Sequence, residues 1–335
     1  MSPSALLLTA ALIPAAASMQ QQQQQQQRIA TAFRAAFDEA SAVSGGSVYS
    51  GQDVKGLSDV DAEVPLVATL HFCGSDETVQ LGPTDRRFLA QSCFKPLTYA
   101  MAIQLGLNEE VTAAVASVGD VEFGSFALAA DGRALNPLIN SGALVVLELL
   151  SRSHTEEEIG QYCRSIGTTD ASAGACFDAA AVAATVADSL RNRGLSCQLA
   201  SAGSLPKTED AVGRAVRYYA ALDCLLTDTT ELARAAAAFA GGWSEALSAR
   251  TRTATLSAML HGGMYEVSGE WAAEVGLPAK SGVSGAVWCA IPGVGGICAQ
   301  QPRIDGAGNS VAAMALLRGM VARLPELSVF HGARE

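Results

Sequence analysis

A serine and a lysine three positions apart, Ser92 and Lys95, have the types and spacing of a reactive pair. In a helix this spacing places both side chains on one face, about one turn apart, within hydrogen-bond reach of each other. A neutral lysine could then accept the serine proton as the serine attacks a carbonyl carbon, and N–H groups at the helix N-terminus could bind the oxyanion. The alternative is a helix-capping serine followed by a solvated lysine, because four-residue patterns also recur by chance.

A second element, Lys280, Ser281 and Gly282, comes just before a predicted strand at 286–291. In S-x-x-K hydrolases a K-[ST]-G strand lines the site opposite the nucleophile and adds a positive charge and a backbone donor. The two elements in this order favour an active site over a flexible glycine-rich turn. The S-x-N or Y-x-N element of penicillin-recognising enzymes is absent, since none of the five asparagines has serine or tyrosine two positions before it. The sequence therefore argues against a β-lactamase or a transpeptidase.

Hydrophobic periodicity and turn residues predict the elements that position these residues. A Gly-Ser-Asp turn between apolar runs predicts an early hairpin, and the helix that Ser92 opens tolerates Pro96 in its first turn. From about 144 to 240 the chain is rich in Ala, Leu and Glu and poor in strand formers, which predicts a lobe of packed helices. The expected elements are helix 28–42, strands 66–72 and 78–81, helix 92–105, the helical lobe, strands 286–291 and 296–300, and a helix from its cap Asn309 to Leu324.

Strands near both ends of the chain with helices between them predict an α+β fold with one antiparallel sheet built from N- and C-terminal segments. We expect one catalytic domain over 28–325, with the helical lobe inserted, and a tail at 326–335. Residues 1–27 join a short apolar stretch to eight glutamines and are expected to be disordered low complexity. The stretch is too short to cross a bilayer and no basic residue precedes Arg28, so the compartment stays open, with cytoplasm or mitochondrion favoured over secretion.

The composition limits the partners. The 335-residue chain is 49% hydrophobic, which is enough to bury a large core. Its net charge of -11, with only 22 lysines and arginines, argues against nucleic acid and anionic membranes and favours a small ligand. The four histidines and eight cysteines show no ligand spacing, so we expect no metal and no organic cofactor, and we interpret the cysteines as free thiols in a reducing compartment.

Three longer segments resemble the serine-dependent glutaminases, both the bacterial and the mitochondrial animal enzymes. They are LAQSCFKPLTYAMAI, LNPLINSGALVV and the stretch that runs from GGMYEVSG to GAGNSV, within a similarity from about Gly46 to Arg318. The resemblance implies a β-lactamase-like fold and a homo-oligomer, dimer or tetramer. It also implies hydrolysis of the side-chain amide of L-glutamine to glutamate and ammonia through a glutamyl-serine intermediate.

By this resemblance Ser92 is the nucleophile, Lys95 its base and Tyr265 the phenol that moves protons. We expect positive charge from Lys95 and Lys280 to lower the pKa of Tyr265 for that role. The oxyanion is assigned to the backbone N–H groups of Ser92 and Val283, and Asn136 is expected to fix the turn before Pro137. The substrate-binding positions that the resemblance implies are Ser92, Asn140, Asn192, Tyr218, Tyr265, Val283 and the strand residues Lys280, Ser281 and Gly282.

Two departures concern the group that would hold the α-ammonium of the substrate. The family has a glutamate where this sequence has Thr185, and a tyrosine where it has Gly51, with Tyr49 two residues away. Asp188 or Asp178 could replace the glutamate from a neighbouring helical turn, or the alignment could be off by one turn. The remaining alternatives are an inactive paralogue that acts as a scaffold or regulatory subunit, and an enzyme for another amide or ester.

Overall fold

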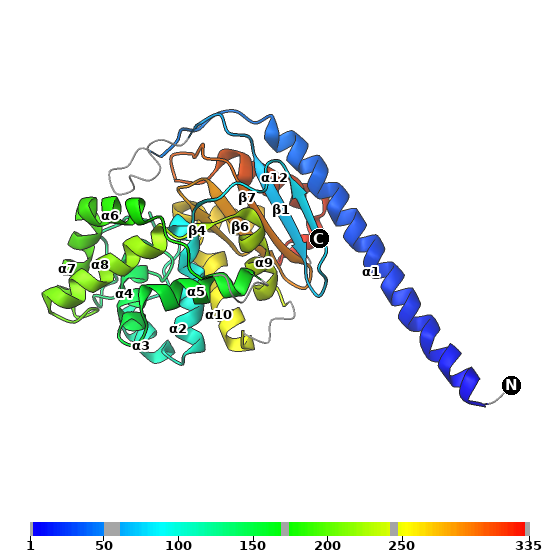
Figure 1. The fold of residues 1–335 in the computed structure, drawn as a ribbon, viewed down its shortest axis with the longest axis horizontal. Helices are drawn as coiled ribbons and strands as arrows, with labels where there is room; N and C mark the ends of the chain where they lie inside the picture. The colour runs from blue at the N-terminus through cyan, green and yellow to red at the C-terminus, as the bar shows by residue number, and fades with distance from the viewer. Residues whose placement is uncertain (1–2, 50–60, 169–173, 242–246, 332–335) are drawn as a thin grey trace.

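A computed structural model describes residues 3–49, 61–168, 174–241 and 247–331. A twisted sheet lies between one layer of helices and a larger helical lobe (Figure 1). The sheet has five antiparallel strands in the order β2-β1-β7-β6-β5. The strands are β1 (Val67–Phe72), β2 (Thr78–Leu81), β5 (Ala279–Gly282), β6 (Ala286–Ile291) and β7 (Gly295–Gln300).

The pairing of β1 with β7 joins the N-terminal hairpin to the C-terminal strands, with Val67 opposite Gln300 and Phe72 opposite Gly295. This arrangement confirms the predicted α+β fold with one sheet from both ends of the chain. A separate pair, β3 (Phe88–Leu89) with β4 (Leu226–Thr227), connects the segment before Ser92 to the helical lobe.

Both faces of the sheet are covered, so alternate residues of each strand enter different cores. Val287, Cys289 and Ile291 of β6 belong to a core under two long helices, α1 (Pro3–Ser41) and α12 (Val311–Arg323). Ala286 and Trp288 of the same strand belong to the core of the helical lobe. This two-sided burial explains why β6 is apolar at every position of its sequence.

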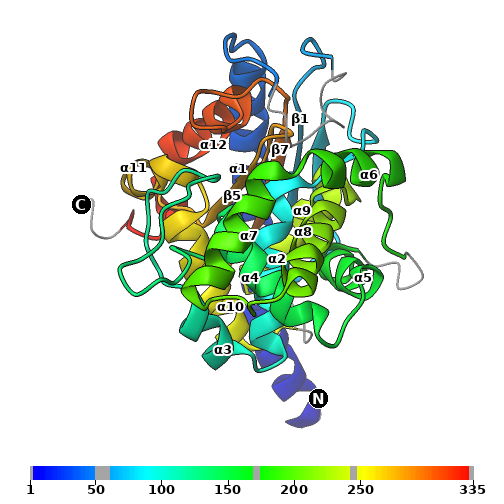
Figure 2. The same cartoon turned by 90° about the vertical axis from the view of Figure 1, so that its left-hand side faces the viewer.

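The helical lobe packs on the second face of the sheet through α9, and Figure 2 views the molecule from the side of this lobe. Its core joins residues of the nucleophile segment to those of α4 and α8. The helices of this side are α2 (Lys95–Gln104), α3 (Asn108–Ala114), α4 (Asn140–Ser151), α5 (Glu156–Gly167), α6 (Ala179–Asp188), α7 (Leu190–Ala202), α8 (Glu209–Asp223), α9 (Thr229–Phe239) and α10 (Ala249–Gly262). The short helices are η2 (Gln91–Phe94), η3 (Tyr265–Val267), α11 (Ser268–Glu274) and η4 (Pro325–Leu327).

The N-terminal helix differs from the sequence prediction. Helix α1 is continuous from Pro3 to Ser41, whereas we expected disorder up to residue 27. Ile29, Phe33 and Ala36 anchor its C-terminal part under α12, and the glutamines and alanines before them have good helix propensity, so the helix extends outward from that anchor (Figure 1). Within the residues described, no helix is both long and apolar enough to cross a membrane.

Two helix starts also differ from prediction. Ser310, not Asn309, caps the last helix, because its hydroxyl accepts the N–H of Ala313. The helix expected to open at Ser92 is divided into the 3-10 turn η2 and the α-helix α2, which starts at Lys95. This division puts Ser92 in a tight turn just before the helix.

Candidate active site

Ser92 lies in a strained, buried turn against the edge of the sheet. Gln91, just before it, has a φ of 47°, which is unfavourable for a residue with a side chain. The turn packs on β5 so closely that a Cβ on Gly282 would lie 3.0 Å from the sulfur of Cys93. Neither Ser92 nor its neighbours cap a helix through a side chain, so the capping interpretation of this serine is wrong.

Lys95 is fully buried, which excludes the solvated lysine of the alternative interpretation. Its Nζ donates to Oδ1 of Asn140 at 2.6 Å, and Nδ2 of Asn140 donates to Oδ1 of Asn192 at 3.1 Å. Burial lowers the pKa of Lys95 to about 7, although the nearby charge of Asp223 acts in the opposite direction. A useful fraction of the amine is therefore neutral near pH 7 and can accept a proton.

Two tyrosine hydroxyls lie beside the Ser92 side chain, those of Tyr219 and Tyr265. Tyr219 also donates to Oδ1 of Asn140 at 2.8 Å, and its ring lies 5.3 Å from Nζ of Lys95. Tyr265 is the first residue of η3 and has a φ of 59°. Backbone strain thus accompanies both the nucleophile turn and this tyrosine, as is common at functional sites.

The pKa of the Tyr265 phenol is raised, whereas we expected nearby positive charge to lower it. Burial raises its pKa well above the ordinary value and outweighs the opposing contacts with Ser92 and Ser281. Its hydroxyl donates to the carbonyl of Ser281 at 2.7 Å. The expected lowering fails because the lysines that would supply positive charge are themselves buried, which makes their charged forms unfavourable. The hydroxyl of Tyr265 is therefore protonated near neutral pH.

Strand β5 supplies the opposite wall. Lys280 is fully buried, its Nζ lies 4.2 Å from the ring centre of Tyr265, and it donates to the carbonyl of Ser281 at 2.5 Å. Burial, together with the charge of Lys95, lowers the pKa of Lys280 well below its ordinary value. The strand ends at Gly282, and Val283 is buried beside the segment that leads into the nucleophile turn.

The structure places Tyr218 away from this cluster. Its hydroxyl donates to the carbonyl of His154 at 3.1 Å. Neighbouring residues of a helix point about 100° apart, so Tyr218 and Tyr219 face different partners. The side chain that reaches Asn140 from α8 is Tyr219, which the sequence argument missed by one position. The tyrosine pair in VRYYAAL was the available signal, and only the position of α8 decides between its members.

The residues considered for the missing carboxylate are dispersed. Thr185 is buried in α6, where its hydroxyl lies 3.5 Å from the sulfur of Cys224. Asp178 caps α6 by accepting the N–H of Ala181, and Asp188 lies half-buried at the last turn of that helix. Gly51 lies outside the described residues.

Aromatic rings connect Tyr49 to the site. Its ring centre lies 6.3 Å from that of Phe123, which in turn lies 5.3 Å from that of Tyr265. Tyr49 is half-buried, so it is placed at the edge of the cluster.

A buried carboxylate that the sequence analysis did not single out faces this cluster. Asp223 ends α8, is 4% exposed, and its charge acts on Lys95, Lys280 and both site tyrosines. It stands in an alanine- and leucine-rich run that is typical of a core helix, so no pattern of residues indicated its position.

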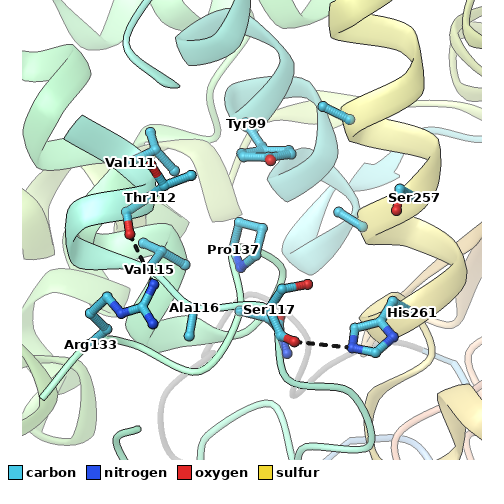
Figure 3. A pocket seen from close by; sticks show the side chains of 13 residues that line it. Tyr99, Val111, Thr112, Val115, Ala116, Ser117, Arg133, Pro137, Ser257 and His261 are labelled. Carbon is cyan, nitrogen blue, oxygen red and sulfur yellow. Dashed lines mark hydrogen bonds between the residues drawn. The ribbon is translucent and has the colours of Figure 1, made fainter. Parts of the chain in front are cut away.

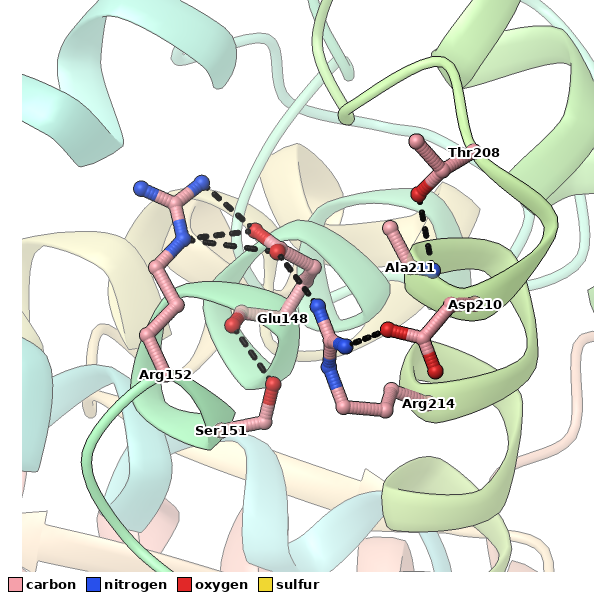
Figure 4. A network of polar contacts seen from close by, with 7 residues as sticks. All are labelled: Glu148, Ser151, Arg152, Thr208, Asp210, Ala211 and Arg214. Carbon is pink, nitrogen blue, oxygen red and sulfur yellow. Dashed lines mark hydrogen bonds and ion pairs between the residues drawn. The ribbon is translucent and has the colours of Figure 1, made fainter.

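An ion-pair network fixes the two helices that carry Asn140 and Tyr219 (Figure 4). Glu148 of α4 is buried and lies 2.7 Å from Arg152 of the same helix and 3.6 Å from Arg214 of α8. Because the two arginines hold one carboxylate, the network ties α4 to α8 and limits how far Asn140 and Tyr219 can move apart.

A pocket of about 270 Å³ lies behind the loop that leads to Asn140 (Figure 3). Asn136 shapes this loop, because its Oδ1 accepts the N–H of Leu138 at 2.9 Å, as expected for the turn before Pro137. His261 lines the pocket and contacts the carbonyl of Ser117 at 3.3 Å, so it supports the loop.

Together these groups can perform acyl transfer. A serine that contacts a protonated phenol and lies three residues before a buried lysine of lowered pKa can attack an amide or ester carbonyl, and the backbone at η2 and β5 can receive the oxyanion. No group of three or more potential metal-ligating side chains gathers anywhere in the part of the chain that is described.

Comparisons with known proteins point to one family. The family model described as Glutaminase matches residues 51–330. A glutaminase of Corynebacterium glutamicum is 34% identical over 246 residues, which cover 71% of this chain and 59% of that protein. A glutaminase of Shewanella baltica is 30% identical over 287 residues, which cover 81% of this chain and 90% of that protein. The chain spans less than two thirds of the first-named relative.

Solved structures of glutaminases are similar to this chain in fold. A probable glutaminase, YbaS, superimposes with a TM-score of 0.76 at 26% identity, over 89% of this chain and 97% of that chain. Mglu in its glutamate form superimposes with a TM-score of 0.76 at 29% identity, over 88% of this chain and 68% of that chain.

Proposed function

The chain belongs to the glutaminase family, and from that premise we propose that it hydrolyses the side-chain amide of L-glutamine to L-glutamate and ammonia. The observation that carries the proposal is the buried cluster around Ser92, in which two tyrosine hydroxyls contact the serine and Lys95, whose pKa is lowered, shares Asn140 with one of them. Each of these groups has a place in amide hydrolysis.

In the first half of the reaction Lys95, in its neutral form, accepts the proton of Ser92 while Oγ attacks the amide carbon. The tetrahedral oxyanion is held by the backbone N–H groups of Ser92 and Val283. Asn140 orients the amine of Lys95 through their 2.6 Å hydrogen bond. Because one N–H of the amine is held by Asn140, the lone pair of neutral Lys95 stays available to accept a proton.

Collapse of the tetrahedral species breaks the C–N bond, and Tyr265 protonates the departing nitrogen to give ammonia. The proton that Lys95 accepted from the serine balances the one that the phenol gives up. Water then attacks the glutamyl ester of Ser92, the C–O bond breaks, and glutamate leaves as the serine regains its proton. The raised pKa of Tyr265 means that its phenol is protonated when the reaction begins, so the proton for the departing nitrogen is in place.

The test is ammonia release from L-glutamine by the full chain, compared with Ser92→Ala. We expect activity in the wild-type protein and a loss of at least about a thousandfold in the variant. An active wild-type protein whose Ser92→Ala variant is equally active would overturn the mechanism, and a wild-type protein without activity would overturn the function.

A second candidate is an enzyme for another amide or ester, because Thr185 stands where the family resemblance implies a carboxylate. Hydrolysis of a simple ester without hydrolysis of L-glutamine would favour it. A scaffold or regulatory subunit would hydrolyse neither compound and would not be acylated at Ser92.

We also propose an intracellular setting and a homo-oligomer. All eight cysteines are free, and five of them are buried, which fits a reducing compartment. Family membership supports a dimer or a tetramer, which light scattering coupled to size-exclusion chromatography would measure.

A further inference from the structure

Two acidic side chains are buried among the described residues, Glu148 and Asp223. Glu148 is held by Arg152 and Arg214, so its charge is balanced within the protein (Figure 4). Asp223 lies at the opposite end of α8, where its charge acts on both lysines of the Ser92 cluster. Burying a carboxylate is unfavourable unless cationic or hydrogen-bonding groups face it, so its place beside a catalytic cluster calls for a function.

The fold directs Asp223 toward the nucleophile. It follows Tyr219 by one helical turn, so both side chains lie on one face of α8. Two residues later, the carbonyl of Leu225 accepts the N–H of Ala90 at 2.8 Å, and Ala90 begins the turn that contains Ser92. The end of α8 is therefore fixed against the start of the nucleophile turn.

The same end of α8 also borders α6. The carbonyl of Cys224 accepts the N–H of Asp178 at 3.1 Å, and the sulfur of Cys224 lies 3.5 Å from the hydroxyl of Thr185. Asp223 thus stands at the junction of α6, α8 and the nucleophile turn.

An amino-acid amide such as L-glutamine needs an anionic side chain in its binding site. L-Glutamine carries an α-ammonium group, and neither lysine of the cluster, Lys95 or Lys280, can serve as its anionic partner. A buried ammonium without an anionic partner binds weakly, because it loses its water without compensation. Asn140, Asn192 and the tyrosines supply neutral donors and acceptors only.

We propose that Asp223 binds the α-ammonium group of the substrate and thereby selects amino-acid amides over amides that lack this group. The inference rests on the proposed glutaminase function and names the residue that gives it specificity. Asp188, which the sequence suggested for this role, is half-buried at the end of α6, and we assign the role to Asp223 instead.

A competing role for Asp223 is to hold positive charge on the two lysines. The binding role predicts that Asp223→Asn is less active on L-glutamine, and the charge role predicts a changed rate for every substrate. They differ for glutaric acid monoamide, which has the same reacting amide and the same carboxylate but no α-ammonium. Only the binding role predicts that this second substrate is spared.

The experiment measures kcat/KM for both substrates with the full chain at about pH 8, above the pKa of Lys95, so that the lysine is largely neutral in every variant. For the wild-type protein we expect L-glutamine to be preferred by at least about tenfold. In Asp223→Asn the preference should fall by roughly a hundredfold, with kcat/KM for the monoamide within about threefold of wild type. The matched control, Asp188→Asn, should keep the wild-type preference.

Equal losses for both substrates in Asp223→Asn, or loss of the preference in Asp188→Asn, would overturn the assignment of Asp223. If Asp223→Asn does not fold, as judged by circular dichroism, the test is the ratio of the two kcat/KM values in the wild-type protein. Equal values for L-glutamine and the monoamide would mean that the protein has no ammonium site, and the assignment would be wrong. A wild-type protein that hydrolyses neither substrate would instead refute the proposed function.

Discussion

Two single substitutions, Tyr219→Phe and Tyr218→Phe, test which tyrosine of α8 belongs to the active site. The structure indicates Tyr219, whereas the family resemblance implied Tyr218. Tyr219→Phe deletes a group that donates to Asn140 at 2.8 Å and contacts the Ser92 side chain. Tyr218→Phe deletes a group that donates to the carbonyl of His154 at 3.1 Å. The two changes are chemically identical and differ only in where the hydroxyl lies.

The expected magnitudes follow from the partners. A buried hydrogen bond contributes about 1 to 3 kcal/mol when its loss leaves a partner incompletely satisfied, which corresponds to roughly 5- to 150-fold in a rate constant. Oδ1 of Asn140 still accepts from Lys95 after Tyr219→Phe, so folding should lose only about 1 kcal/mol. We therefore expect kcat/KM of this variant to fall about 10- to 100-fold, and that of Tyr218→Phe to stay within about twofold.

The assay is ammonia release from L-glutamine over a range of substrate concentrations, with urea unfolding of each variant as a control for stability. A Tyr218→Phe variant that loses as much activity as Tyr219→Phe would refute the placement of α8. So would a Tyr219→Phe variant with wild-type kinetics.

Three further predictions concern the base, the β5 contact and the ion-pair network. Because Lys95 must be neutral to accept a proton, kcat/KM should increase as the pH rises through about 7 and should be low at more acidic pH. A pH profile that is flat across this range would contradict the role of Lys95 as base. Gly282→Val should lower activity by about a hundredfold or more with native circular dichroism, because the new side chain would displace the turn that holds Cys93, and retained activity would exclude this tight contact. Arg214→Met should reduce the free energy of unfolding in urea by about 1 to 2 kcal/mol by removing one partner of buried Glu148, and an unchanged unfolding curve would show that the network contributes nothing.

The sequence predicted what depends on local spacing. Ser92 and Lys95 are three positions apart, and Lys280 to Gly282 are consecutive, so each element is recognisable wherever the chain folds. The family resemblance and the α+β sheet from both chain ends are confirmed by the comparisons and the strand order.

What the sequence could not predict depends on positions between distant segments. The choice between Tyr218 and Tyr219 depends on how α8 is rotated against α4, and one residue of error turns a side chain by about 100°. The pKa of Tyr265 depends on its burial, which outweighs any nearby charge. Asp223 lies in a segment whose sequence is typical of a core helix. Only the folded structure shows that its charge acts on Lys95 and Lys280.

The most direct test of the central claim is the site at which the protein becomes acylated. The full chain is incubated with an electrophilic analogue of L-glutamine, and the modified residue is located by mass spectrometry of its peptides. We predict one label, on Ser92, that forms far more slowly in Lys95→Ala. A label on another residue, such as the exposed thiol of Cys197, or no label at all, would contradict it.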